Sequence, residues 1–180
     1  MRSVARAWGK GGIAVQHHEP QNDATLNVHA VDVAEYILRK MSGFVDAMKL
    51  QKLCYYAQAW SLAWGRGAMF PEEIEAWDRG PVVRSLFARH KGMFSVQSVG
   101  GNADIIARDR VRVATIRDVL NFYGHMTGDQ LSELAHSELP WQQTRAEAGA
   151  RDGQACDRII PRTLIGNYYR GLMREELTTR

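Results

Sequence analysis

The chain has 180 residues, which is enough for one domain with a sizeable core. Hydrophobic residues make up 45% and charged residues 24%, values typical of a globular protein that argue against wholesale disorder. The net charge of +3 is too small to argue for a protein that tracks phosphates. No apolar run approaches the roughly 18–20 residues that span a bilayer, so a transmembrane helix is not expected.

The two cysteines, Cys54 and Cys156, are too few for the disulfide framework of a small secreted protein, and there is no CxxC pair. Near the N-terminus, Gly9, Gly11 and Gly12 stand where a signal peptide would have its apolar core. By elimination we expect a cytoplasmic protein.

Residues 1–24 differ from the rest of the chain. They show little apolar periodicity and contain the pair His17-His18 followed by a polar run over residues 19–23. We therefore expect a flexible N-terminal tail over residues 1–24 and one compact domain over residues 25–176.

The domain begins with two predicted helices. Apolar residues recur at helical spacing from Val31 to Met41, and Ser42-Gly43 should end that helix. The strongest helix is predicted to start after the N-cap residue Asp46 and to end at Gly65. Apolar side chains cover nearly its whole circumference. This pattern indicates a buried central helix, or a helix with a second surface for a partner.

The middle of the chain is less regular. Residues 68–77 suggest a small β-hairpin or two extended pieces. Gly80-Pro81 is predicted to open a helix with proline in its first turn, where the missing N–H costs nothing, and Gly92 should end it. A loop is the preferred interpretation of residues 93–108.

Helical patterns return in the last third of the chain. One helix is predicted over residues 113–123, and another from Thr127, which forms a capping-box pattern with Gln130. Pro140 should open one more turn with Trp141 packed inward, residues 142–157 suggest a loop or a short helix, and Pro161 should open the last helix. The predicted fold class is thus mainly α, with a small hairpin near residues 68–77. Most tryptophans are expected in the core.

Catalytic and metal-binding motifs are missing from the sequence. It contains no GxSxG, Walker A, GxGxxG or HExxH motif, and no two histidines have metal-site spacing on a helix. His17-His18 could chelate a metal, but plain tail residues are the favoured interpretation. Glu72, Glu73 and Glu75 are better explained as a solvated turn than as a cation site. We expect no enzyme, no cofactor and no metal site.

Residues 113–140 have the outline of a helix-turn-helix. The second helix would carry Asp129, Glu133 and Glu138 and no lysine or arginine, so it would repel phosphates. We reject it as a recognition helix, and nucleic-acid binding is not expected from this region.

Two segments carry a family resemblance. Residues 49–60 read KLQKLCYYAQAW and residues 74–83 read IEAWDRGPVV. Together they resemble the Panacea domain, also called the SocA-like antitoxin domain, whose members show K-L-Q-K-L-x-Y-x-x-Q-x-W followed by I-E-A-W-x-x-G-P-V-V. The resemblance is strong over residues 30–91. Arg84 stands where many relatives have proline and Cys54 where leucine is usual.

The resemblance implies a mostly helical antitoxin that binds and neutralises a co-encoded protein toxin. It also implies, as a second step, a proteolytic adaptor that delivers the toxin to the ClpXP protease. Partner choice would then lie in variable surfaces, with the shared motif as scaffold. The alternative is a DNA-binding regulator that represses its own operon, and an unrecognised enzyme ranks third.

Four residues are candidates for partner binding: Lys49, Lys52, Tyr56 and Arg84. The first three lie at i, i+3 and i+7, so they share one face of the predicted central helix. Basic and aromatic residues together are favoured at protein interfaces. The competing interpretation is that the lysine stems merely cover apolar neighbours.

Overall fold

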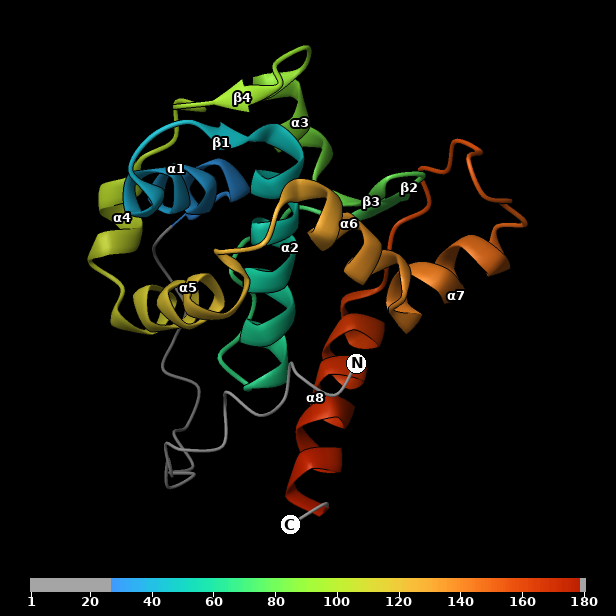
Figure 1. Cartoon of the computed structure of the whole chain (residues 1–180). Coiled ribbons are helices and arrows are strands. Elements are labelled where there is room, and N and C mark those ends of the chain that lie inside the picture. The colour runs from blue at the N-terminus through green and yellow to red at the C-terminus, as the bar shows by residue number, and fades with distance from the viewer. Residues whose placement is uncertain (1–26, 179–180) are drawn as a thin grey trace.

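A computed structural model describes residues 27–178 (Figure 1). The predicted tail and its histidine pair lie outside the described residues. The described chain is mainly α-helical, with eight helices and four short strands: α1 Ala30–Met41, β1 Val45–Asp46, α2 Ala47–Ala63, β2 Glu75–Trp77, β3 Gly80–Val82, α3 Arg84–His90, β4 Ser95–Val96, α4 Ala103–Ala107, α5 Arg110–Tyr123, α6 Gly128–His136, α7 Leu139–Glu147 and α8 Arg162–Thr178.

Helix α2 lies at the centre of the fold. It packs against α1, α5, α6 and α8, and all of its residues are buried except Met48, Lys49 and Leu62. The Asp46 carboxylate accepts a hydrogen bond of 2.8 Å from the N–H of Lys49, as expected of an N-cap. The predicted central helix is therefore confirmed, and its lack of a polar face follows from being enclosed on all sides.

The other helices surround α2 (Figure 1). Helices α1, α4 and α5 lie on one side, α6 and α7 on the other, and α8 runs beside the C-terminal half of α2. The predicted capping box of Thr127 and Gln130 is present at the start of α6. Of the tryptophans, Trp60 and Trp141 are buried as expected, whereas Trp64 and Trp77 are partly exposed.

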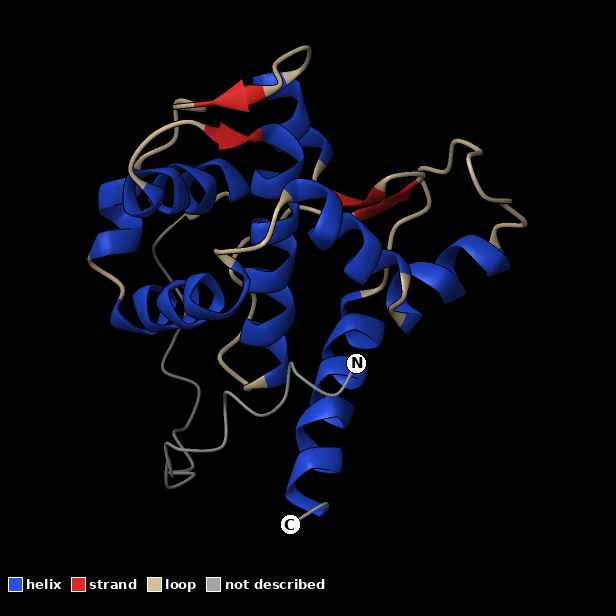
Figure 2. Cartoon of the chain, in the orientation of Figure 1, coloured by secondary structure: helices blue, strands red, loops and turns tan. Residues whose placement is uncertain are grey.

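The strands form two separate antiparallel pairs (Figure 2). In one, β2 pairs with β3, so that Glu75 lies opposite Val82. The predicted fold class, mainly α with a small hairpin, is therefore confirmed. The hairpin spans residues 75–82, a few residues later than the predicted range 68–77. In the other pair, Val45 of β1 lies opposite Val96 of β4.

The predicted helix start at Gly80-Pro81 is wrong. These residues form β3, and α3 begins only at Arg84. Gly80 has φ +102°, which no helix contains, and the N–H of Val83 donates to the side chain of Gln51 at 3.0 Å. A long-range contact with α2 therefore overrides the local signal of a proline that could have opened a helix.

Residues 93–108 are not the single loop that their sequence predicts. They contain β4 and the short helix α4. Two carboxylates of α1 hold this segment: Asp32 accepts from the N–H of Asn102 at 2.7 Å, and Glu35 accepts from the N–H of Val99 at 2.9 Å. The partners are more than sixty residues apart in sequence, so no local pattern could reveal them.

Helix α7 is also longer than the single predicted turn. Its Arg145 is buried and donates to the carbonyls of Ala76, Arg151 and Gln154, which fixes the end of the helix. In the part of the chain that the structure describes, no helix has the length and hydropathy that a membrane crossing requires.

Candidate functional site

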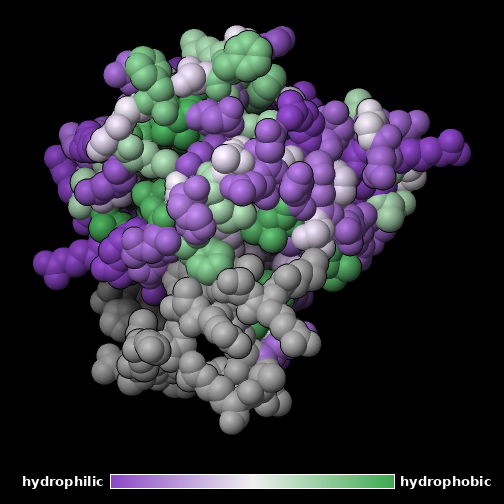
Figure 3. All heavy atoms as spheres, viewed as in Figure 1, coloured by the Kyte–Doolittle hydropathy of each residue, from purple (hydrophilic) through white to green (hydrophobic). Residues whose placement is uncertain are grey.

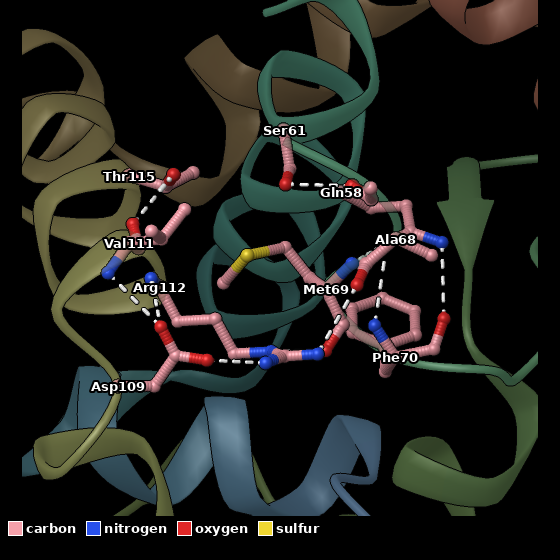
Figure 4. A network of polar contacts seen from close by, with 10 residues as sticks. Gln58, Ser61, Ala68, Met69, Phe70, Asp109, Val111, Arg112 and Thr115 are labelled. Carbon is pink, nitrogen blue, oxygen red and sulfur yellow. Dashed lines mark hydrogen bonds and ion pairs between the residues drawn. The ribbon is translucent and has the colours of Figure 1, made fainter. Parts of the chain in front are cut away.

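The buried polar side chains of α2 bind the segment that leads through the β2–β3 hairpin. Gln58 accepts a hydrogen bond of 2.6 Å from the N–H of Met69 and donates one of 3.2 Å to the carbonyl of Phe70 (Figure 4). From α5, Arg112 donates to the carbonyl of Met69 and pairs with Asp109. The loop after α2 is thus bound by side chains from two helices.

Gln51 also binds a backbone group of this segment, just after the second strand of the hairpin. It lies one heptad before Gln58 on α2, accepts from the N–H of Val83 at 3.0 Å, and contacts the His90 ring at 2.9 Å. His90 is buried, and burial lowers its pKa. The two glutamines therefore fix both ends of residues 69–83.

Lys52 lies between them and is only 1% exposed. Its ammonium donates to the carbonyl of Pro81 at 3.2 Å. Burial lowers its pKa to about 7, and the nearby Arg79 charge acts in the same direction. A Cβ at residue 80 would lie 2.7 Å from the Lys52 Cε atom, and the backbone there has φ +102°, so both the contact and the conformation favour glycine. Gln51, Lys52, Gly80, Pro81 and Val83 are all motif residues, and each has a structural role.

A second group of buried side chains, most of them tyrosines, packs around the middle of α2. The Tyr56 ring stacks on Tyr123 with 4.1 Å between centroids, and Glu138, which precedes α7, accepts a hydrogen bond of 2.6 Å from the Tyr169 hydroxyl. Burial raises the pKa of Glu138 to about 8, against the opposing effect of the Tyr169 and Tyr56 hydroxyls. This carboxyl group links α7 to α8.

This pKa predicts a pH dependence of stability. Between about pH 4.5 and 8 the folded chain holds a proton on Glu138 that the unfolded chain has lost, so the free energy of unfolding falls as the pH rises. Glu138→Gln keeps the hydrogen-bond acceptor for Tyr169 and removes the titration. We expect the stability of the variant relative to the wild type to rise by up to about 1.4 kcal/mol per pH unit in this window.

Urea denaturation at pH 5, 6, 7 and 8 measures this difference. Lys52, whose pKa is lowered to about 7, gives the opposite slope above that pH, but it is present in both proteins and cancels in the comparison. A constant difference between variant and wild type across the four pH values would contradict a raised pKa at Glu138.

The four candidate partner-binding residues divide into two pairs. Lys52 and Tyr56 are buried, at 1% and 0% exposure, so neither side chain is presented to a partner in this structure. Lys49 and Arg84 do reach the surface. Lys49 donates to the carbonyl of Gly124 at 2.7 Å, and Arg84 pairs with Glu75 at 2.6 Å. Their role in binding stays a prediction.

Other sequence predictions also meet the structure here. Cys54 is fully buried on α2, and burial raises the pKa of its thiol. The acidic residues near 72–75 are not a solvated turn, because Glu72 accepts from the N–H of Ala30 at 3.0 Å and Glu75 binds Arg84. These carboxylates stabilise the start of α1 and the hairpin.

One surface feature was not foreseen from the sequence. Phe44, Met93 and Phe94 are exposed beside the β1–β4 pair, and we call these three residues the β1–β4 patch. An open hollow of about 360 Å³ adjoins it, with Phe44 and Lys49 among its lining residues. The local sequence indicates only a turn before each exposed segment: Ser42-Gly43 precede Phe44, and Gly92 precedes Met93 and Phe94.

Comparison with known proteins identifies the family. Residues 50–142, just over half of the chain, match the family described as antitoxin SocA-like, Panacea domain. The chain therefore belongs to this family, which supports an antitoxin role. No curated protein and no solved structure matches the chain significantly. The matched residues run from α2 into α7, so they include the hydrogen bonds that Gln51, Lys52 and Gln58 make to the hairpin segment.

Proposed function

We propose that this protein neutralises a co-encoded protein toxin by binding it, and that it catalyses no reaction itself. The observation that carries the proposal is the match of residues 50–142 to the SocA-like antitoxin family. A protein that works by binding needs a rigid scaffold and an accessible surface. The polar residues of α2 supply the first, since they bind backbone groups of the hairpin segment inside the fold.

The buried ionisable groups favour a binding role over catalysis. Lys52 donates to the Pro81 carbonyl and Glu138 accepts from the Tyr169 hydroxyl. Both groups are closed off from solvent, at 1% and 4% exposure. A general acid or base must instead reach a bound substrate. Their perturbed pKa values are therefore explained by burial in a scaffold.

Coexpression tests the binding function. Cells that express the product of the adjacent gene alone should stop growing, and expression of this protein should restore growth and yield a stoichiometric complex on copurification. An unrelated protein of the same size at the same level serves as the control. Continued growth arrest together with the absence of a complex would contradict neutralisation by binding.

A proteolytic adaptor that delivers the toxin to ClpXP is the finer form of this proposal. It rests on the family alone. In cells that contain ClpXP, an adaptor should shorten the half-life of the toxin after translation is stopped, and deletion of the protease should remove the effect. A toxin half-life that lengthens in the presence of this protein would show simple sequestration instead.

A further inference from the structure

The β1–β4 patch is the main concentration of exposed apolar side chains in the described chain. Phe44 is 73% exposed, Met93 54% and Phe94 93%. The antiparallel pairing brings the segments together, because the N–H of Ala47 donates to the carbonyl of Phe94 at 2.9 Å. Figure 3 shows apolar side chains gathered at this end of the molecule. Large apolar clusters on a protein surface mark interaction sites.

The backbone holds the patch outward. Val45 and Val96, the paired residues of the two strands, point into the core at 4% and 1% exposure, so Phe44, the neighbour of Val45, is directed toward solvent. Met93 and Phe94 precede β4 and are exposed in the turn that leads into it. The turn before Phe44 contains Ser42 with φ +51°, the single non-glycine residue with positive φ among residues 27–178. Ser42 is the C-cap of α1, where a left-handed residue commonly ends a helix and redirects the chain, here toward Phe44.

The surroundings of the patch are basic. Helix α1 ends shortly before Phe44, and α3 ends shortly before Met93. The exposed residues Lys40 and Lys91 lie at these two helix ends. Within residues 27–178, neither lysine forms an ion pair with a carboxylate. Lys49 lines the adjoining hollow. Two carboxylates lie there as well, since Asp46 caps α2 and Asp129 pairs with Arg79. With Lys40, Lys49, Lys91 and Arg79 set against Asp46 and Asp129, the rim has a net positive charge.

We propose that the β1–β4 patch is the surface that docks the co-encoded toxin, through an apolar segment of the toxin flanked by acidic side chains. This assignment rests on the proposed antitoxin function. Charge decides among the possible occupants. A second copy of this chain, related by a two-fold axis, would bring the same lysines against each other. The chain's own residues 1–26 carry Arg2, Arg6 and Lys10 against Glu19 and Asp23, so their net charge is also positive and does not favour them as the occupant.

The apolar part is tested with Phe94→Glu in the purified full-length chain. Phe94 is almost fully exposed, so the fold should persist, which circular dichroism and thermal melting verify. We expect the Kd for the toxin to rise at least about 100-fold. An aromatic residue of the patch is replaced by a carboxylate, and the acidic side chains proposed for the toxin segment would repel that carboxylate. Val111→Glu, at a 50% exposed position on α5, is the matched control and should bind as the wild type does.

The charged part is tested with Lys40→Glu combined with Lys91→Glu. Association should slow about tenfold at low salt, and the difference should shrink as salt is added. Arg110→Glu, which reverses one exposed charge at the start of α5, should leave the association rate unchanged.

The outcomes separate this surface from the function on which it rests. A wild-type complex that Phe94→Glu leaves intact refutes the patch as the docking surface while the antitoxin function stands. A wild-type chain that binds no toxin refutes both. If the wild type is a dimer in sedimentation and Phe94→Glu is a monomer with unchanged toxin affinity, the patch is an interface between copies of this chain and the proposal is wrong.

Discussion

Replacing Gly80 with alanine is expected to destabilise the protein by about 3–4 kcal/mol, a large fraction of the stability of a domain of this size. Two costs add. The backbone at residue 80 has φ +102°, which an L side chain rarely adopts. The new Cβ would also lie 2.7 Å from Cε and 2.9 Å from Nζ of Lys52, a side chain fixed by burial and by its hydrogen bond to Pro81.

Urea denaturation measures this effect, and Gly171→Ala is the matched control. Gly171 lies within α8, where an added Cβ would meet no atom within 4 Å, and the variant should gain about 0.5–1 kcal/mol from helix propensity. The same chemical change should thus have opposite signs at the two positions. Equal effects at residues 80 and 171 would contradict the tight packing of Gly80 against Lys52.

Gln58→Met is expected to cost about 3 kcal/mol. The variant keeps the length of the side chain but leaves the N–H of Met69 and the carbonyl of Phe70 without their hydrogen-bond partner in a buried position. Each unsatisfied buried group costs about 1–3 kcal/mol, and repacking offsets part of the sum.

Chemical denaturation of Gln142→Met provides the control, because Gln142 lies exposed on α7. Its effect should stay within about 0.5 kcal/mol, as is usual for surface substitutions. Hydrogen exchange adds a local readout: the amides of residues 69 and 70 should lose protection in Gln58→Met well before the rest of α2 does. Unchanged protection at these two amides would show that Gln58 does not hold the loop.

Elements with local signals were predictable from the sequence. Asp46 marks the start of α2, and Thr127 with Gln130 marks the start of α6. These signals act within one helical turn, so neighbouring residues suffice to read them. The central position of α2 was also predictable, because an apolar surface on all sides leaves no face for solvent.

Elements that depend on distant partners were not predictable. The strand β3 replaces a predicted helix start because Gln51 binds the N–H of Val83, thirty-two residues later in the chain. Likewise, β4 exists through its pairing with β1. Proline and glycine signals allow several structures, and the tertiary contact chooses between them.

The candidate site shows the same division. Lys52 and Tyr56 share a helix face, as their spacing predicts, but that face is covered by other elements. A buried lysine is rare, and nothing in the local sequence indicates that the Pro81 carbonyl will receive its ammonium group. Phe44 and Phe94 are exposed because of how two distant segments pair, so their hydrophobicity alone would have placed them in the core.

The enclosure of α2 has a consequence for biosynthesis. The face of α2 that carries Tyr55 is closed by Tyr169 of α8, with 6.2 Å between the ring centroids, and α8 leaves the ribosome after the other helices of residues 27–178. Until then the nascent chain exposes the apolar surface of its central helix. A chain that is truncated or trimmed before residue 162 would therefore remain incompletely folded and open to proteases, because the central helix is enclosed only once α8 is present.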